Sequence, residues 1–156
     1  MLTKIVSGGQ TGADQAALDV AIELGIPHGG WIPKGRPTEA GPLPEKYQLQ
    51  EMATTSYPKR TEQNVIDSDG TAIISHGKLT GGSEFTRKSA EKHNKPWLHL
   101  DLEKMSLTYA ARLLKSWAMD NGVKVLNVAG PRASKDKEIY DTTVKLLTAI
   151  LPKKKD

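Results

Sequence analysis

Short apolar runs rich in β-branched residues alternate with longer runs of helical periodicity along the chain. Such alternation is typical of a parallel, doubly wound sheet covered by helices. Clear strands are predicted at residues 4–7, 71–75, 97–100 and 125–128, with shorter ones near 31–32 and 48–50. Helices are predicted at residues 13–24, 60–69, 83–92, 106–119 and 139–151. The pattern indicates an α/β fold with a mostly parallel sheet and leaves the strand order open.

The chain has 156 residues, 37% of them apolar and 26% charged, which suits a single folded domain. We assign residues 1–152 to this domain and residues 153–156 to a basic C-terminal tail. The absence of cysteine excludes disulfides, cysteine-ligated metals and thiol nucleophiles. No apolar run approaches the ~20 residues of a membrane helix, and the first residues do not resemble a signal peptide. We therefore expect a cytoplasmic protein with no membrane contact.

The net charge of +4, from 22 basic and 18 acidic residues, favours an anionic partner. Part of the excess lies near the C-terminal end, at Lys145 and residues 153–155. Only 5% of the residues are aromatic, and no basic stripe alternates with them as in a nucleic-acid surface. The composition therefore favours a small anion over nucleic acid.

The first candidate binding loop is Ser7-Gly8-Gly9-Gln10-Thr11-Gly12-Ala13-Asp14, which leads from a strand into a helix. Ligands of open α/β sheets bind beyond the carboxyl ends of strands, at such loops. Glycine lets the backbone approach a ligand, and the first N–H groups of the helix then face an anion. The spacing is neither a P-loop nor a dinucleotide fingerprint. An anion cradle and a purely structural turn are both open, with Asp14 able to complement the helix dipole.

The second candidate loop runs from His76 to Thr86 and also leads from a buried strand into a helix. It carries two adjacent glycines and several hydroxyl groups. Thr80 or Ser83 could alternatively be a plain helix N-cap. If the two strands are neighbours, both helix N-termini would converge on one anion. The candidate residues in this loop are Thr80, Gly81, Gly82, Ser83, Glu84 and Thr86.

The third candidate loop, residues 128–134, contains Gly130 and Arg132. Arg132 could clamp a phosphate, whereas Ser134 could cap the closing helix. Lys34 and Arg36 lie in a Gly/Pro-rich segment and offer either mobile positive charge beside the site or an exposed turn. Two further residues, Asn64 and Asp69, could reach the same crevice from the end of the helix at 60–69.

Other catalytic or metal-binding signatures are weak. The four histidines at positions 28, 76, 93 and 99 lack a metal-binding spacing. No nucleophile elbow and no paired carboxylates in a predicted pocket are visible. The sequence thus predicts an anion cradle without an obvious nucleophile, and we assign no catalytic residue and no metal ligand.

Several motifs occur together, namely Ser7-Gly8-Gly9-Gln10-Thr11-Gly12-Ala13-Asp14, Gly30-Trp31-Ile32-Pro33-Lys34-Gly35-Arg36, Arg60-Thr61-x-x-Asn64-Val65, Asp67-Ser68-Asp69-Gly70-Thr71, Thr80-Gly81-Gly82-Ser83 and Asn127-Val128-Ala129-Gly130-Pro131-Arg132. In this combination the chain resembles the molybdenum carrier family over nearly its whole length. The resemblance implies a three-layer, Rossmann-like fold and a role in holding molybdenum cofactor, a pterin with a phosphate and a dithiolene-bound molybdate. It also implies molybdoenzymes as recipients and a homodimer or homotetramer.

That family is similar in turn to a Rossmann-like superfamily of nucleoside-monophosphate phosphoribohydrolases, often labelled lysine decarboxylases, and DNA-processing protein A. The hydrolases carry P-G-G-x-G-T-x-x-E, whose glutamate acts in cleavage of the glycosidic bond. Aligned on Gly81-Gly82, this glutamate falls on Lys88. Glu84 lies earlier in the helix and would not point the same way. The departure argues against hydrolase activity and leaves phosphate binding intact.

The leading hypothesis is a non-catalytic carrier that holds a phosphorylated pterin or nucleotide-like anion on the N–H groups of residues 9–13 and 81–84. One alternative is a nucleotide N-glycosidase with Glu84 or Asp14 as the acid. Another is a nucleic-acid-binding module, by analogy with the DNA-processing protein. The predicted cofactor-binding residues are Gly8, Gly9, Gln10, Thr11, Gly12, Ala13, Asp14, Lys34, Arg36, Asn64, Thr80, Gly81, Gly82, Ser83, Glu84, Thr86, Gly130 and Arg132.

Overall fold

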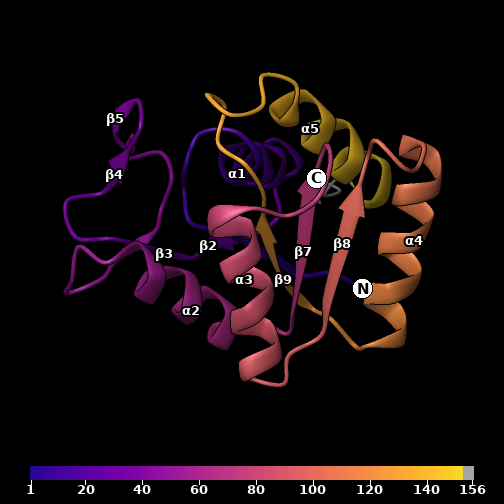
Figure 1. The fold of residues 1–156 in the computed structure, drawn as a ribbon, viewed down its shortest axis with the longest axis horizontal. Helices are drawn as coiled ribbons and strands as arrows, with labels where there is room; N and C mark the ends of the chain where they lie inside the picture. Colours follow the sequence, from indigo (N-terminus) through magenta and orange to yellow (C-terminus); the bar gives the residue numbers. More distant parts are fainter. Residues whose placement is uncertain (153–156) are drawn as a thin grey trace.

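The computed structural model describes residues 1–152 and shows a central parallel sheet between two layers of helices (Figure 1). The predicted tail at 153–156 lies outside the described residues. The sheet has five strands in the order β2-β1-β9-β7-β8. They are β1 (Lys4–Val6), β2 (His28–Gly29), β7 (Gly70–Ser75), β8 (Trp97–Asp101) and β9 (Val125–Ala129). All four neighbouring pairs are parallel, which confirms the predicted three-layer, Rossmann-like α/β fold.

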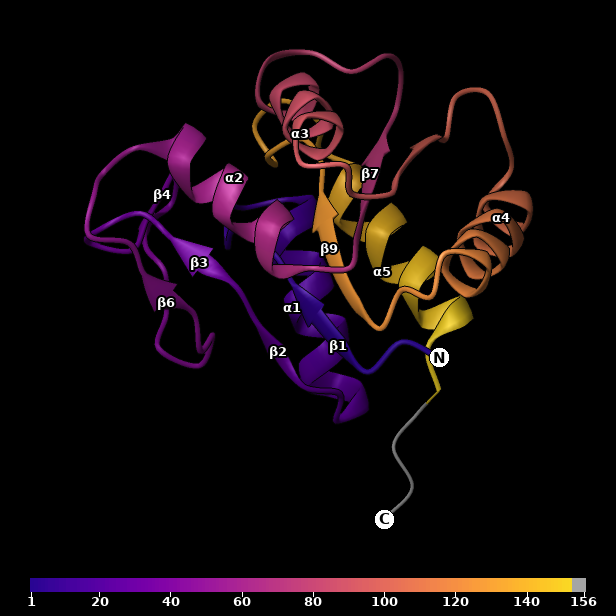
Figure 2. The same cartoon turned by 90° about the horizontal axis from the view of Figure 1, so that it is seen from below.

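Two groups of helices cover the two faces of the sheet (Figure 2). On one face α1 (Ala13–Leu24) and α4 (Leu107–Asp120) both pack against α5 (Ile139–Ile150). On the other face α2 (Tyr57–Asp67) packs against α3 (Gly81–Lys92). Strand β7 is buried along its whole length, as a central parallel strand covered on both faces should be. No helix among residues 1–152 is both long and apolar enough to cross a membrane.

The main core lies between the sheet and the layer formed by α1, α4 and α5. Its fully buried side chains come from the apolar stripes that the sequence periodicity predicts, and include Ile5, Ala17, Ile74, Leu100, Leu114, Leu126, Leu146 and Leu147. A second, smaller core forms beneath the segment between β2 and α2, from Leu18, Ile32, Leu43, Tyr47 and Leu49. Burial of these apolar surfaces is the main force that holds the layers together.

The Gly/Pro-rich segment between β2 and α2 folds into two small ribbons outside the main sheet. Strand β3 (Trp31–Ile32) pairs in parallel with β6 (Gln50–Glu51), where the sequence predicts a strand at 48–50. Strands β4 (Pro37–Thr38) and β5 (Gly41–Pro42) form an antiparallel hairpin that projects from the body (Figure 1). The tip of this hairpin, at Glu39, turns back towards the carboxyl ends of the main strands.

Helices α2 and α3 begin earlier than predicted, whereas α5 begins at Ile139 as predicted. Helix α2 begins at Tyr57, since Ser56 accepts a hydrogen bond from the Lys59 N–H and Pro58 sits in the first turn. Helix α3 begins at Gly81, with Thr80 at the N-cap position but without a side-chain capping bond. Ser134 does not cap α5, which starts at Ile139.

The sheet order brings three strand ends together. Strand β9 lies between β1 and β7, and the chain continues from these two strands outward in opposite directions, to β2 and to β8. The loops after β1, β7 and β9 therefore meet at one edge, at the switch point where open α/β sheets bind ligands. The expectation that the strands before loops 7–14 and 76–86 are neighbours is wrong, because β9 lies between β1 and β7. Residues of both loops nevertheless line one cavity.

Candidate functional site

A cavity of about 570 Å³ opens at this edge of the sheet, within the usual range of ligand pockets. The loops after β1, β7 and β9 form part of its wall, and helix α2 and the hairpin tip complete it. Its lining residues are Gly8, Gln10, Asp14, Thr38, Glu39, Tyr57, Pro58, Arg60, Thr61, Asn64, Thr80, Gly81, Gly82, Ser83, Phe85, Thr86, Asn127, Val128, Ala129, Gly130, Pro131, Arg132 and Lys135.

The N-terminus of α3 supplies free hydrogen-bond donors to this cavity. The backbone N–H groups of Gly81 and Gly82 find no acceptor among residues 1–152, whereas the Ser83 N–H is used by the Thr80 carbonyl at 3.1 Å. The Lys135 Nζ lies 3.5 Å from the position that a Cβ atom on Gly81 would occupy. Two free amides at the positive end of a helix beside an ammonium group suit an anion.

The loop after β1 differs from the prediction, because most of its N–H groups are already used inside the protein. The Gly9 N–H donates to Ser7 Oγ at 3.4 Å and the Gln10 N–H to Asp14 Oδ2 at 3.3 Å. The Thr11 N–H donates to Gln10 Oε1 and the Ala13 N–H to the Pro131 carbonyl. A cradle of N–H groups over residues 9–13 is therefore not available in this arrangement.

The glycines of the first loop have packing roles. Gly9 has φ of +77°, and a Cβ atom there would lie 2.9 Å from Leu43 Cδ2, inside the small core. Gly12 has φ of +85°, and a Cβ atom would lie 2.4 Å from the Pro131 carbonyl oxygen. Positive φ and close contact both require glycine here. These two residues and Ala13 do not line the cavity.

Asp14 and Arg60 are two buried ionisable residues that line the cavity. Both are at least nine-tenths buried, and Arg60 Nη1 donates to the Gly8 carbonyl at 2.5 Å. Burial raises the pKa of the Asp14 carboxyl to about 6, and the charge of Arg60 opposes that rise. Asp14 is thus a cavity group that can hold or release a proton near neutral pH.

An apolar and aromatic wall faces these polar groups. Tyr57 and Phe85, from α2 and α3, line the cavity and remain 44% and 36% exposed. The Arg60 guanidinium lies 5.4 Å from the centre of the Tyr57 ring, within cation–π range. Exposed aromatic faces beside hydrogen-bonding groups suit a flat ring compound.

The rim of the cavity carries a hydrogen-bond network around Glu39. Its carboxylate accepts from the hydroxyls of Thr11 and Ser134 and from the Ser134 N–H at 3.1 Å. Arg132 Nε lies 3.6 Å from Glu39 Oε1. The hydrogen bond from Ser134, and after it the one from Thr11, contributes most to holding the pKa of Glu39 below its usual value.

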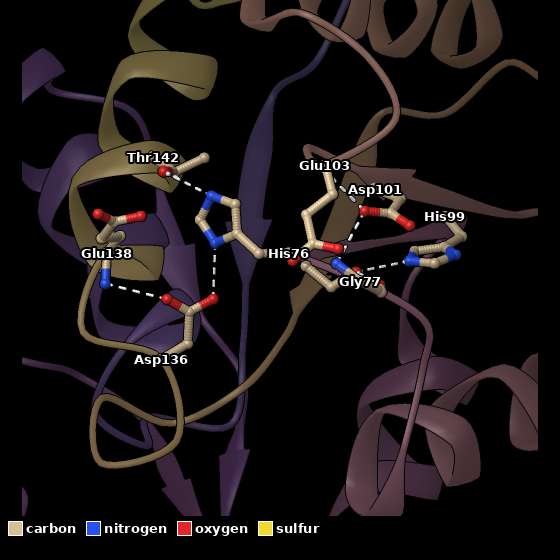
Figure 3. Close-up of polar contacts among 9 residues, drawn as sticks. His76, Gly77, His99, Asp101, Glu103, Asp136, Glu138 and Thr142 are labelled. Carbon is tan, nitrogen blue, oxygen red and sulfur yellow. Dashed lines mark hydrogen bonds and ion pairs between the residues drawn. The ribbon is translucent and has the colours of Figure 1, made fainter.

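Two further networks fix the loops behind the cavity (Figure 3). His76 turns towards α5, with Nδ1 2.6 Å from Asp136 Oδ2 and Nε2 3.3 Å from Thr142 Oγ1. This bond joins the loop after β7 to the segment that carries Arg132, Ser134 and Lys135.

On the other side of the β7 end, the Gly77 N–H donates to Asp101 Oδ1 at 2.8 Å. His99 Nε2 lies 2.7 Å from Ser75 Oγ. Because the Ser75 hydroxyl donates to the Gly77 carbonyl at 2.5 Å, His99 Nε2 is the donor to Ser75 Oγ. Burial lowers the pKa of His99, and Asp101 opposes that effect. Ser75, His99 and Asp101 thus hold the β7 turn in place.

The structure brings eleven of the eighteen predicted residues to the cavity, namely Gly8, Gln10, Asp14, Asn64, Thr80, Gly81, Gly82, Ser83, Thr86, Gly130 and Arg132. Thr11 contacts the rim through Glu39. Asn64 also has a structural role, because its side-chain amide bonds both the N–H and the carbonyl of Trp31. Asp69 lies at the opposite end of β7, where it accepts from the N–H groups of Lys124 and Val125.

Three predicted residues point elsewhere. The Arg36 guanidinium donates to the carbonyls of Leu43, Pro44, Tyr47 and Leu49, so it braces the segment and does not offer mobile charge. Lys34 is exposed and does not line the cavity. Glu84 pairs with Arg87 and lines a separate hollow beside His99.

Sequence reasoning missed several lining residues, above all Arg60, Asn127, Lys135, Glu39, Tyr57 and Phe85. For Asn127 the signal was present, since a polar residue inside a buried strand is unusual. Its amide donates to Thr71 Oγ1 at 3.2 Å. Arg60 belongs to a motif that carries the family resemblance, but its burial comes from the packing of α2 against the loop after β1.

The parallel sheet and the switch-point cavity define a Rossmann-like protein with a candidate ligand-binding site at the carboxyl edge of the sheet. The sequence model of the circularly permutated YpsA SLOG family matches residues 5–151. The chain therefore belongs to this family.

A solved structure from Syntrophus aciditrophicus SB, described as "Putative molybdenum carrier protein", is 60% identical in sequence. The match covers 96% of this chain and 95% of that chain, with a TM-score of 0.95. This similarity confirms the resemblance that the sequence motifs indicate. The comparison with curated proteins gives no match.

Proposed function

We propose that the protein binds a phosphorylated ring compound in the cavity and acts as its carrier. The observation that carries the proposal is the pair of unused N–H groups at Gly81 and Gly82 beside Lys135. A phosphate there would take up the free donors, and the lysine would neutralise part of its charge. Arg132 at the rim supplies a second positive charge.

The remaining cavity suits the ring. Tyr57 and Phe85 offer aromatic surface, and Asn127 offers a carboxamide on the floor. Asp14 accepts hydrogen bonds when ionised and donates one when protonated, and its pKa of about 6 makes both forms accessible. Such a mixture of apolar walls and few polar groups is typical of sites that orient a heterocycle.

Molybdenum cofactor is the ligand that we favour, because the 60% identical relative is named for molybdenum. The N–H groups of Gly81 and Gly82 with Lys135 suit its phosphate, and the aromatic and amide side chains of the cavity suit its pterin. The described residues contain no cluster of three His, Cys, Asp or Glu side chains that could hold a metal ion. The protein would therefore hold this cargo by its organic part and leave the molybdenum end for transfer to a molybdoenzyme.

The test compares Gly82→Pro with Gly82→Ala. Residue 82 lies in the first helical turn, where proline is tolerated, and has open space around its Cβ position. Proline removes the N–H and alanine keeps it. Calorimetric titrations use molybdenum cofactor, metal-free molybdopterin and a nucleoside monophosphate. Loss of a charged hydrogen bond costs about 1.5–3 kcal/mol. Binding should therefore weaken by roughly 10- to 150-fold in Gly82→Pro and stay unchanged in Gly82→Ala. Equal affinities of the two variants would overturn the phosphate placement, and no binding of any of the three compounds would overturn the function.

One observation favours a second candidate, a nucleotide N-glycosidase. Asp14 is a cavity carboxyl with a raised pKa, as a general acid requires. Glu84, the other acid considered, is paired with Arg87 away from the cavity. Release of the base from a nucleoside monophosphate, lost in Asp14→Asn, would support this activity. Intact nucleotide after prolonged incubation would exclude it for that substrate.

We also propose that the protein self-associates. Tyr109 and Met119 on α4 are 56% and 67% exposed, and large exposed apolar side chains are enriched at interfaces. Light scattering of the purified protein tests this, with a dimer or tetramer expected. A monomer at high concentration would contradict it.

A further inference from the structure

We propose that Thr11, Ser134 and Arg132 form an oxyanion subsite at the cavity rim, and that the carboxylate of Glu39 occupies this subsite when no anion is bound. A tetrahedral oxyanion, either free or at the end of a larger ligand, would compete with Glu39 and displace the hairpin tip. The inference rests on the proposed function in one respect, since both place an anion in the same cavity.

The donors around Glu39 make up the first part of the evidence. The Ser134 N–H and hydroxyl and the Thr11 hydroxyl all donate to its two oxygens, and Arg132 Nε lies 3.6 Å away. The Ala133 N–H donates to Thr11 Oγ1 at 3.1 Å, which directs the Thr11 hydroxyl proton towards Glu39. Backbone N–H, hydroxyl and guanidinium donors converging on two oxygens are what a phosphate group also requires.

The second part of the evidence is the place of Glu39 in the chain. Glu39 sits at the tip of the β4–β5 hairpin, and its main partner Ser134 lies 95 residues further along the chain. Apart from the side chain, the tip is joined to the rim by the Glu39 N–H, which donates to Gln10 Oε1 at 2.9 Å. Glu39 and Ala40 are both exposed, so these polar contacts, and not apolar burial, hold the tip in place.

The base of the hairpin, by contrast, is firmly anchored. The Arg36 guanidinium holds the carbonyls of Leu43, Pro44, Tyr47 and Leu49, and three of those residues belong to the small buried core. The tip can therefore leave the rim without unfolding its base. The Glu39 carboxylate lies beside Arg132 and lines the cavity, so its negative charge opposes anion binding until it moves.

The experiment measures binding of orthophosphate, molybdate and a phosphate monoester by calorimetry in wild type, Glu39→Ala and Glu39→Gln. Glu45→Ala is the matched control, because Glu45 is an exposed acidic residue of the same segment and its loss changes the net charge equally. We expect Glu39→Ala to bind at least one of these anions tenfold or more tightly than wild type. Glu39→Gln should gain less and Glu45→Ala nothing. A gain with the free oxyanions only would identify a free anion as the occupant, and a gain with the monoester would identify the end of a larger ligand.

A triple variant locates the effect. Adding Thr11→Val and Ser134→Ala to Glu39→Ala should abolish the gain, and circular dichroism checks that each variant is folded. Unchanged affinity for all three anions in folded Glu39→Ala and Glu39→Gln would overturn the subsite, as would a gain that survives in the triple variant. Failure of the proposed function has a different signature, namely no binding of molybdenum cofactor, metal-free molybdopterin or a nucleoside monophosphate to the protein with Glu39 intact.

Discussion

The guanidinium of Arg60 occupies the space that a side chain on Gly8 would need. A Cβ atom on residue 8 would lie 2.5 Å from Arg60 Nη1 and 2.7 Å from Cζ. Gly8 therefore serves the cavity by admitting a buried cation and by offering that cation its carbonyl oxygen. Gly8, in the loop after β1, thus helps to hold the buried charge of Arg60 on helix α2.

Gly8→Ala should destabilise the protein by ~1–3 kcal/mol, because the new methyl group must displace a buried, paired arginine. For a chain of this size this corresponds to a fall in the melting temperature of roughly 2–12 °C. Gly82→Ala is the control, since its Cβ would meet no atom within 4 Å and alanine favours the helix by up to ~1 kcal/mol. Equal melting temperatures of Gly8→Ala and wild type would contradict the steric role.

Asp14 should make stability fall as the pH rises. Its pKa is about 6 in the folded protein against 3.8 ordinarily, so the folded chain binds this proton more tightly than the unfolded chain. The resulting stabilisation is present below pH 3.8 and is lost as the pH rises through about 6. The loss is on the order of 2–3 kcal/mol.

The Asp14→Asn variant should lack this pH-dependent contribution to stability, while the other carboxyl groups titrate equally in both proteins. Urea unfolding at several pH values from 4 to 7 measures the difference in the free energy of unfolding between the two proteins. We expect that difference to change steadily over this range, on top of a constant offset from the loss of the carboxyl group near the buried Arg60. A difference that is flat with pH would show that Asp14 has an ordinary pKa.

The hydrogen bond between His76 and Asp136 should hold the segment after β9 in place and thereby increase the affinity for the ligand. His76→Ala should cost ~1–3 kcal/mol of stability and weaken anion binding, because it frees the segment that carries Ser134 and Lys135. In a double-mutant cycle, Asp136→Ala should add little to His76→Ala. Lys137→Ala, an exposed change in the same segment, should stay within about 0.5 kcal/mol of wild type. Fully additive effects of the two substitutions would rule out this coupling.

Arg36 should act on stability and not on the ligand directly. Arg36→Ala should lose ~2 kcal/mol or more, because it leaves several carbonyls without their charged donor, and hydrogen exchange should rise over residues 43–49. Lys34→Ala removes a nearby charge that makes no such contacts and should be neutral. Unchanged exchange protection together with lost ligand binding would instead identify Arg36 as a ligand-binding cation.

Much of the fold is predictable from local patterns. The strand at 71–75 and the helix at 107–120 have the apolar period and length of a buried strand and an amphipathic helix. The loops at 7–14 and 76–86 are predictable as candidate binding loops, because a glycine-rich turn that leads from a strand into a helix has few other common roles. Helices α2 and α3 begin three and two residues before the predicted starts, at Tyr57 and Gly81, because the apolar period does not determine where a helix ends.

Most of the predicted site residues line one cavity, but the sequence does not indicate which of their polar groups are free. Gly81 and Gly82 lie open to the cavity as the sequence indicates, whereas the N–H groups of residues 9–13 are largely used by Ser7, Gln10, Asp14 and Pro131. A backbone amide looks the same in sequence whether it is free or bonded. Only coordinates distinguish a cradle from a closed turn.

By itself the sequence determined the α/β class, the helices and strands, and the loops able to approach a ligand, because these depend on residues close together in the chain. Tertiary structure decided that β9 lies between β1 and β7, that Arg60 is buried beside Asp14, and that Glu39 reaches Ser134. Each of these pairings joins segments far apart in sequence, and burial and charge at such contacts depend on all the neighbours at once. The chemistry of the cavity is therefore a property of the packed molecule.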